Sequence, residues 1–169
     1  MKFIFLLGLL LILFCQYTFS QKDSSLQAKN LIYIEGGGIG GYGSLNYERV
    51  LLSRKKFNVG ARVGISTYHI YDYTNSMNPD ILILTSLNGS YGLNHKIEIA
   101  IGETTSNIVY ADQINFMPYR KTNFHTHFSL GYKYQKNTRG LFFRIAYTPL
   151  FELNKTYRNW MGVSLGYSF

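Results

Sequence analysis

A polar cluster in the last third of the chain carries the side chains best suited to chemistry. His125, His127 and Ser129 occur at every second position, so in an extended strand they share one face. An imidazole beside a serine hydroxyl, as in the pair His127 and Ser129, could remove its proton and let the oxygen attack an ester. A carboxylate must orient the imidazole, and Glu152 and Glu98 are the candidates. The alternative interpretation is that the cluster fills a polar interior.

The same cluster could contribute to a metal site. His125 and His127 supply two ligands, fewer than the three or four that zinc takes from a protein. The other histidines, His69 and His95, fall in connections that we place at opposite ends of the fold. We therefore expect neither a metal nor another cofactor.

A glycine-rich stretch contains the spacing G-x-G-x-x-G at Gly38, Gly40 and Gly43. In a dinucleotide-binding loop a helix follows these glycines, and its N-terminus holds a phosphate. Here residues 44–49 alternate like a strand instead. The glycines therefore predict a tight hairpin between two strands.

The elements that must position these side chains are short amphipathic strands. Residues 57–66 show the pattern most clearly, because large apolar side chains alternate there with Asn, Gly, Arg and Ser. Eight such runs occur and none has helical periodicity, which predicts an all-β protein. The predicted strands are 31–37, 42–51, 57–66, 80–90, 96–104, 123–134, 141–150 and 158–169.

The connections between these strands alternate in length. Short turns are predicted near Ser53, Leu93 and Lys136, and longer loops at 67–79, 104–121 and 151–158. Small outer-membrane barrels have an even number of strands, short turns at one end and longer loops at the other. The pattern therefore predicts an eight-stranded antiparallel up-and-down transmembrane β-barrel over residues 31–169. The first hairpin is the exception, because it is short where a long loop is expected.

The N-terminal segment has the features of a cleaved signal peptide. Lys2 precedes an apolar run over residues 3–14, and Thr18 and Ser20 are small residues at −3 and −1 of a cut before Gln21. The run is shorter than the roughly 20 residues of a membrane-spanning helix. We predict a signal peptide at 1–20 and a periplasmic leader at 21–30. Removing the signal peptide lowers the formal net charge from +8 to +7, because Lys2 is its one charged residue.

The two faces of the predicted strands indicate an inverted barrel. One face carries large apolar residues, and the other carries glycines and mid-strand charges, which need partners or water. An eight-stranded barrel is only wide enough for side chains to fill it. We therefore predict a lumen plugged by paired charges, and the alternative is that these charges form the solvated outer face of a soluble sandwich. The residues of this predicted lumen network are Glu35, Glu48, Arg62, Glu98, Lys133 and Arg144.

Several segments carry a family resemblance. Glu-Gly-Gly-Gly at 35–38, Asn-Tyr-Glu-Arg at 46–49 and the ending Gly-Tyr-Ser-Phe at 166–169 resemble the small eight-stranded outer-membrane proteins of the OmpA/OmpX type, or a porin-like family of Bacteroidetes. The resemblance implies the outer membrane of a Gram-negative cell, contacts with lipid and lipopolysaccharide, and a monomer. It also implies that Phe169 is part of the signal read by the barrel-assembly machinery.

We predict a structural or surface-interaction role without enzymatic activity. The pair His127 and Ser129 resembles that of outer-membrane lipid A deacylases, so a lipid A-modifying esterase is one alternative. A small channel with a water path past Arg62 and Glu98 is another, and a soluble lipid-binding barrel is a third. Nucleic acid is not an expected partner, because the basic residues are scattered over strands and turns. Anionic lipid headgroups are a better use of the positive charge.

Overall fold

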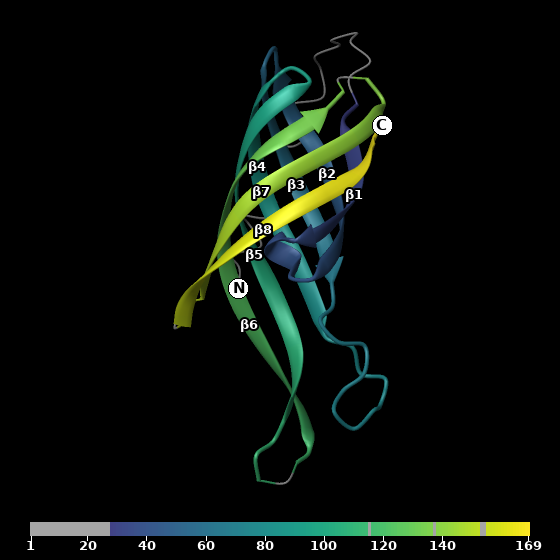
Figure 1. The fold of residues 1–169 in the computed structure, drawn as a ribbon, viewed down its shortest axis with the longest axis vertical. Helices are drawn as coiled ribbons and strands as arrows, with labels where there is room; N and C mark the ends of the chain where they lie inside the picture. The colour runs from purple at the N-terminus through teal and green to yellow at the C-terminus, as the bar shows by residue number, and fades with distance from the viewer. Residues whose placement is uncertain (1–27, 115, 137, 153–154) are drawn as a thin grey trace, which may run out of the picture.

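The computed structural model describes residues 28–114, 116–136, 138–152 and 155–169, which form one closed antiparallel barrel (Figure 1). Each strand pairs with the next along the chain, and β1 closes on β8, so the predicted eight-stranded up-and-down barrel is confirmed. The predicted signal peptide and residues 21–27 of the leader lie outside the described residues. The strands are β1 (Asn30–Gly37), β2 (Gly43–Arg54), β3 (Phe57–Ser66), β4 (Ile81–Gly92), β5 (His95–Ala111), β6 (Pro118–Gln135), β7 (Gly140–Glu152) and β8 (Lys155–Ser168).

A short 3₁₀ turn, η1 (Gly38–Gly40), connects β1 to β2. No helix within the described ranges is long and apolar enough to cross a membrane.

The barrel has two different ends, visible at the top and the bottom of Figure 1. At the first, which we call the turn end, the strands are joined over residues 55–56, 93–94 and 136–139. At the second, the loop end, residues 67–80 form a long connection, and the β5–β6 hairpin projects well beyond the neighbouring strands (Figure 1). The lumen runs between these two ends.

The long hairpin corrects one prediction. Residues 104–121 were expected to form a loop, but β5 continues to Ala111 and β6 begins at Pro118. Polar residues occur on both faces of the outer parts of β5 and β6, at 103–111 and 118–125. The alternation of apolar and polar residues that marks the other strands is therefore missing there. The expected loop 151–158 is also largely strand, since β7 ends at Glu152 and β8 begins at Lys155.

The outward face of the barrel is apolar. Ile34 is 64% exposed, Ile97 65% and Leu165 57%, and similar residues alternate along all eight strands. The inward face carries small, polar and charged residues, with the burial pattern alternating at every second position. This is the reverse of a protein that buries its apolar side chains, and it is the inverted polarity that the sequence predicts.

A few large apolar residues do point inward. Leu31, Tyr33, Val50 and Phe142 pack together inside the barrel. Leu82 and Leu84, which disturb the alternation of β4, are fully buried, and Leu84 lies beside Gly40 of η1. Trp160 shares the inward register of Gly162 and Ser164 on β8, so it is not one of the outward-facing aromatic residues.

Candidate functional site

The lumen of the barrel holds the predicted charged residues. Each of the six lies at an inward position, on β1, β2, β3, β5, β6 and β7 in turn. All are at most 6% exposed. Ionised groups at this level of burial require partners. The residues are Glu35, Glu48, Arg62, Glu98, Lys133 and Arg144.

These residues form one continuous chain of alternating charge across the lumen. Arg62 Nη2 lies 2.9 Å from Glu35 Oε1, and Glu35 Oε2 also pairs with Arg144 Nη2. Arg144 Nη1 lies 3.1 Å from Glu98 Oε1. Lys133 Nζ lies 2.8 Å from Glu98 Oε2 and 2.5 Å from Glu48 Oε1, so it connects these two carboxylates. Three bases thus balance three acids, and the chain of contacts crosses from β3 to β2 through the interior.

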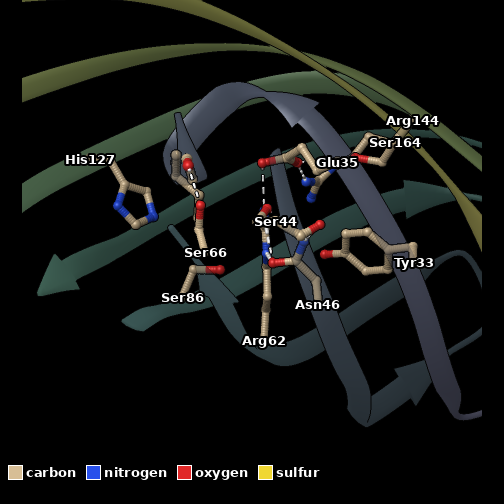
Figure 2. A network of polar contacts seen from close by, with 12 residues as sticks. Tyr33, Glu35, Ser44, Asn46, Arg62, Ser66, Ser86, His127, Arg144 and Ser164 are labelled. Carbon is tan, nitrogen blue, oxygen red and sulfur yellow. Dashed lines mark hydrogen bonds and ion pairs between the residues drawn. The ribbon is translucent and has the colours of Figure 1, made fainter. Parts of the chain in front are cut away.

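Neutral side chains donate further hydrogen bonds to two of the three carboxylates. Ser164 Oγ donates to Glu35 Oε2 at 3.0 Å, and Asn88 Nδ2 donates to Glu48 Oε2 at 3.0 Å. With the ion pairs, each carboxylate oxygen accepts at least one hydrogen bond. Figure 2 shows Glu35, Arg62, Arg144 and Ser164 gathered around Tyr33. The guanidinium carbons of Arg62 and Arg144 lie 5.4 and 5.2 Å from the Tyr33 ring centroid.

One buried base was missing from the predicted network. Lys96 is 2% exposed, and its Nζ donates to Gln135 Oε1 at 3.1 Å. Gln135 Nε2 in turn lies 3.5 Å from the carbonyl oxygen of Ala28. The sequence did hold a signal for this position, because Lys96 shares the inward face with Glu98.

The turn η1 folds into the loop end of the lumen. Its residues are buried, and Ser66 Oγ donates to Gly40 O at 2.6 Å while Thr104 Oγ1 donates to Ile39 O at 3.3 Å. These contacts fasten η1 to β3 and β5. Gly38 has a φ of +68°, and a Cβ there would lie 2.5 Å from Glu35 Oε1, so only glycine fits. The G-x-G-x-x-G spacing thus serves a hairpin that enters the lumen, and β2 follows it.

The candidate catalytic pair lies on the lumen side of β6. His127 is 1% exposed, its Nδ1 is 3.5 Å from Thr104 Oγ1, and its Nε2 has no hydrogen-bond partner among the described residues. Ser129 shares its inward register and is half-buried. Figure 2 shows His127 to one side of the contacts of Glu35 and Arg62.

A triad requires a carboxylate against the imidazole. Both oxygens of Glu98 are occupied by Lys133 and Arg144, and the side chain of Glu152 lies outside those described. His125 Nε2 lies 3.0 Å from Ser106 Oγ. The described contacts therefore do not join His127 to an acid, and the orientation that an esterase needs is not assembled in them.

The remaining histidines are far from this cluster. His69 Nδ1 lies 3.1 Å from Asp80 Oδ2 at the loop end, and His95 Nδ1 lies 2.5 Å from the Tyr132 hydroxyl at the turn end. In the part of the chain that the structure describes, no group of three or more His, Cys, Asp or Glu residues could hold a metal ion.

The loop end presents a second surface, formed by the β5–β6 hairpin and residues 67–80. The Tyr73 hydroxyl donates to Phe116 O at 2.6 Å, and Arg120 Nη2 donates to Pro79 O at 3.0 Å, which holds the two segments together. Ile114 and Met117 are 91% and 64% exposed. The surface is therefore a braced platform with apolar side chains at its tip.

Asp72 organises the 67–80 loop from within. Its Oδ1 accepts hydrogen bonds from Thr74 Oγ1 at 2.6 Å and Thr74 N at 2.9 Å, and its Oδ2 accepts one from Asn78 Nδ2 at 3.1 Å. The hydrogen bonds from Thr74 and Asn78 hold the pKa of the Asp72 carboxyl below its usual range. The charged form of Asp72 therefore supports the loop, and this support is lost only when the pH falls through that lowered pKa.

The barrel is similar to solved outer-membrane barrels. It superposes on the N-terminal β-barrel domain of OprF from Pseudomonas aeruginosa with a TM-score of 0.58 and 14% identity, over 85% of this chain and 98% of that one. It superposes on Ail, the attachment invasion locus protein of Yersinia pestis, with a TM-score of 0.53 and 10% identity, over 85% and 100%. That Ail structure contains the heparin analogue sucrose octasulfate.

A backbone structure of Ail in a phospholipid bilayer nanodisc matches with a TM-score of 0.51 and 9% identity, over 85% of this chain and 100% of that one. No protein-family model matches the sequence, and no curated protein matches it. The fold is that of the small eight-stranded outer-membrane barrels.

Proposed function

We propose that this protein is an outer-membrane β-barrel of a Gram-negative cell envelope with a structural or surface-interaction role. The inverted polarity of the barrel carries the proposal. Large aliphatic side chains cover the outside of all eight strands, and a network of three bases paired with three acids fills the inside. Water would oppose the exposure of this outer face, whereas hydrocarbon solvates it.

Export and assembly follow from the same proposal. Residues 1–20 act as a signal peptide that is removed, residues 21–30 remain as a periplasmic leader, and residues 31–169 form the membrane domain. The turn end faces the periplasm and the loop end faces outward. Phe169, whose backbone exchanges hydrogen bonds of 2.8 and 2.9 Å with Asn30, serves as part of the signal to the barrel-assembly machinery. The barrel acts as a monomer, because its sheet is closed and its outer belt is in contact with lipid.

The interior supports a plugged barrel in preference to a channel. The chain of ion pairs crosses the lumen, and η1 occupies its loop end. The surface role then belongs to the loop end. There the braced platform, formed by the β5–β6 hairpin and residues 67–80, lies beyond the apolar belt among the sugars of lipopolysaccharide. Ail is named for attachment and invasion, and a comparable surface contact is the role we propose for this platform.

Cell fractionation tests the membrane proposal directly. We expect the protein in the outer-membrane fraction, with an unboiled sample that migrates differently from a boiled one, because a closed barrel resists unfolding by detergent at room temperature. The sample is analysed by gel electrophoresis and immunoblotting. A periplasmic band without a heat shift would contradict the proposal and favour the soluble lipid-binding barrel.

A conductance measurement tests the plugged lumen. In planar bilayers the wild-type protein is expected to add no steady ion current, because paired side chains fill the interior. A triple variant, Glu35→Ala with Arg62→Ala and Arg144→Ala, removes half of the network and is expected to let ions pass.

The matched control places three alanines on the same strands but on the outward face, at Ile34, Val63 and Ile145. These positions do not line the lumen, so the control is expected to stay closed. Steady current through the wild-type protein would show that the lumen is a channel.

A further inference from the structure

The exposed charges of the barrel are divided between its two ends. Seven bases lie at the turn end, in or beside the tight turns, and all are exposed. Within the described ranges no acidic side chain accompanies them, and the carboxylate there is that of the terminal residue Phe169 beside Asn30. Glu35, Glu48 and Glu98 are inside the lumen, and the other acids lie in the half of the barrel nearer the loop end. The bases are Lys29, Arg49, Arg54, Lys55, Lys56, Lys136 and Arg139, which together we call the basic collar.

A ring of exposed apolar and aromatic side chains borders the basic collar. It covers the outward side of the strand ends around the barrel, from β2 and β3 through β4 and β6 to β7 and β8. Aromatic residues at this level are typical of the boundary between hydrocarbon and headgroups. The ring consists of Leu51 (58% exposed), Phe57 (46%), Tyr91 (61%), Tyr132 (39%), Leu141 (76%) and Tyr167 (50%).

Arg49 shows how the two layers meet. It lies on the outward face of β2, in the register of Leu45 and Tyr47, and is itself exposed. Its guanidinium therefore extends along the wall of the barrel rather than into the lumen. Arg54, Lys55 and Lys56 follow in the β2–β3 turn. A cation in this position can reach a phosphate at the edge of the hydrocarbon layer.

We infer that the basic collar binds the phosphate groups of anionic phospholipids in the leaflet at the turn end. The inference rests on the proposed membrane function and adds a lipid preference to it. The bases lie at two separate parts of the rim, five of them next to β1 or on β2 and its turn to β3, and two in the β6–β7 connection. Two basic sites beside the apolar ring match a planar layer of headgroups better than the single compact patch of a protein partner. Seven bases against one terminal carboxylate leave this end with a net positive charge, whose field extends over a Debye length of about 10 Å.

This arrangement has a consequence for lipid selection. A neutral phosphatidylcholine and an anionic phosphatidylglycerol offer the same hydrocarbon to the apolar belt, but only the second adds net negative charge at the collar. The barrel should therefore retain phosphatidylglycerol in its first lipid shell more than phosphatidylcholine. The preference should fall at high ionic strength, because the collar is exposed to solvent.

Spin-label electron paramagnetic resonance measures this preference directly. The protein is refolded into phosphatidylcholine vesicles that contain a trace of spin-labelled phosphatidylglycerol or spin-labelled phosphatidylcholine. The motionally restricted fraction of each label gives its relative association with the barrel. We expect the phosphatidylglycerol label to be favoured by about threefold or more at low salt, and the two labels to approach equality at high salt.

Two variants assign the preference to the collar. The variant Arg49→Gln, Arg54→Gln, Lys55→Gln, Lys56→Gln removes four positive charges and is expected to lose most of the preference. The matched control Arg49→Lys, Arg54→Lys, Lys55→Arg, Lys56→Arg changes the same positions but keeps their charge, and it should retain the preference. Lys121→Gln removes an exposed base at the loop end and should also retain it.

The outcomes separate the inference from the proposed function. A gel shift between unboiled and boiled samples reports, for every preparation, whether the barrel has inserted. An inserted wild-type barrel that does not favour phosphatidylglycerol, or a glutamine variant that keeps the preference, would overturn the collar alone. A wild-type chain that does not insert into these vesicles would overturn the membrane proposal, and the collar with it.

Discussion

Replacement of Arg144 by methionine is expected to lower the free energy of unfolding by about 3–5 kcal/mol. Arg144 is 1% exposed and joins Glu35 to Glu98, so its loss leaves two buried carboxylates each without one cation. Methionine keeps much of the side-chain length, and the main effect is therefore electrostatic. The guanidinium also lies 5.2 Å from the Tyr33 ring centroid, and this contact disappears as well.

Urea unfolding in detergent micelles, followed by the fluorescence of Trp160, measures this change. Trp160 is the one tryptophan of the chain. The exposed Lys121→Met serves as a control with the same new side chain, and its unfolding free energy is expected to change by less than about 0.5 kcal/mol. A triple variant, Arg144→Met with Glu35→Gln and Glu98→Gln, should recover part of the loss, because the charges left unpaired are then neutral. A stable Arg144→Met variant without these changes would show that the lumen is well hydrated.

Replacement of Ile99 by arginine is expected to destabilise the protein in lipid by about 2–4 kcal/mol. Ile99 is 61% exposed and lies between Ile97 and Ile101, in the middle of the outward apolar run of β5. A cation at this depth must leave water for hydrocarbon. Reversible unfolding in phospholipid vesicles gives the difference in free energy.

The matched control is Ile114→Arg. Ile114 is 91% exposed but sits in the β5–β6 connection, outside the apolar belt, so arginine there should leave the stability almost unchanged. If both arginine variants were equally stable, the outward face of β5 would be in contact with water. The comparison therefore distinguishes a membrane barrel from a soluble one with the same shape.

Local alternation was enough to predict the strands and the direction of their side chains. In residues 57–66 every predicted inward residue faces inward, because a strand beside lipid on one side and a polar lumen on the other must alternate. The same argument places Glu98 and Lys133 in the lumen. Alternation gives no signal where both faces of a strand are polar. The sequence therefore predicts a loop at 104–121, where β5 in fact continues to Ala111 and β6 begins at Pro118.

The pairing inside the lumen could not be derived from the sequence. Glu35 and Arg144 are 109 residues apart, and they meet because β8 pairs with both β1 and β7 in the closed barrel, which places Ser164 opposite each of them. Likewise, alternation turns Leu84 inward, but the sequence does not show that it packs beside Gly40 of η1 inside the lumen. That contact depends on three-dimensional closure, which a short hairpin sequence does not reveal.

The pairing of β1 with β8 determines when the barrel can close. Among the described strands, β1 is synthesised first and meets its second neighbour only when β8 has been made, with Leu31 opposite Ser168 and Gly37 opposite Gly162. Until then β1 is an open edge, and apolar side chains on every strand face water. Contacts of such long sequence separation also form slowly. The sheet is therefore complete only when β8 pairs with β1.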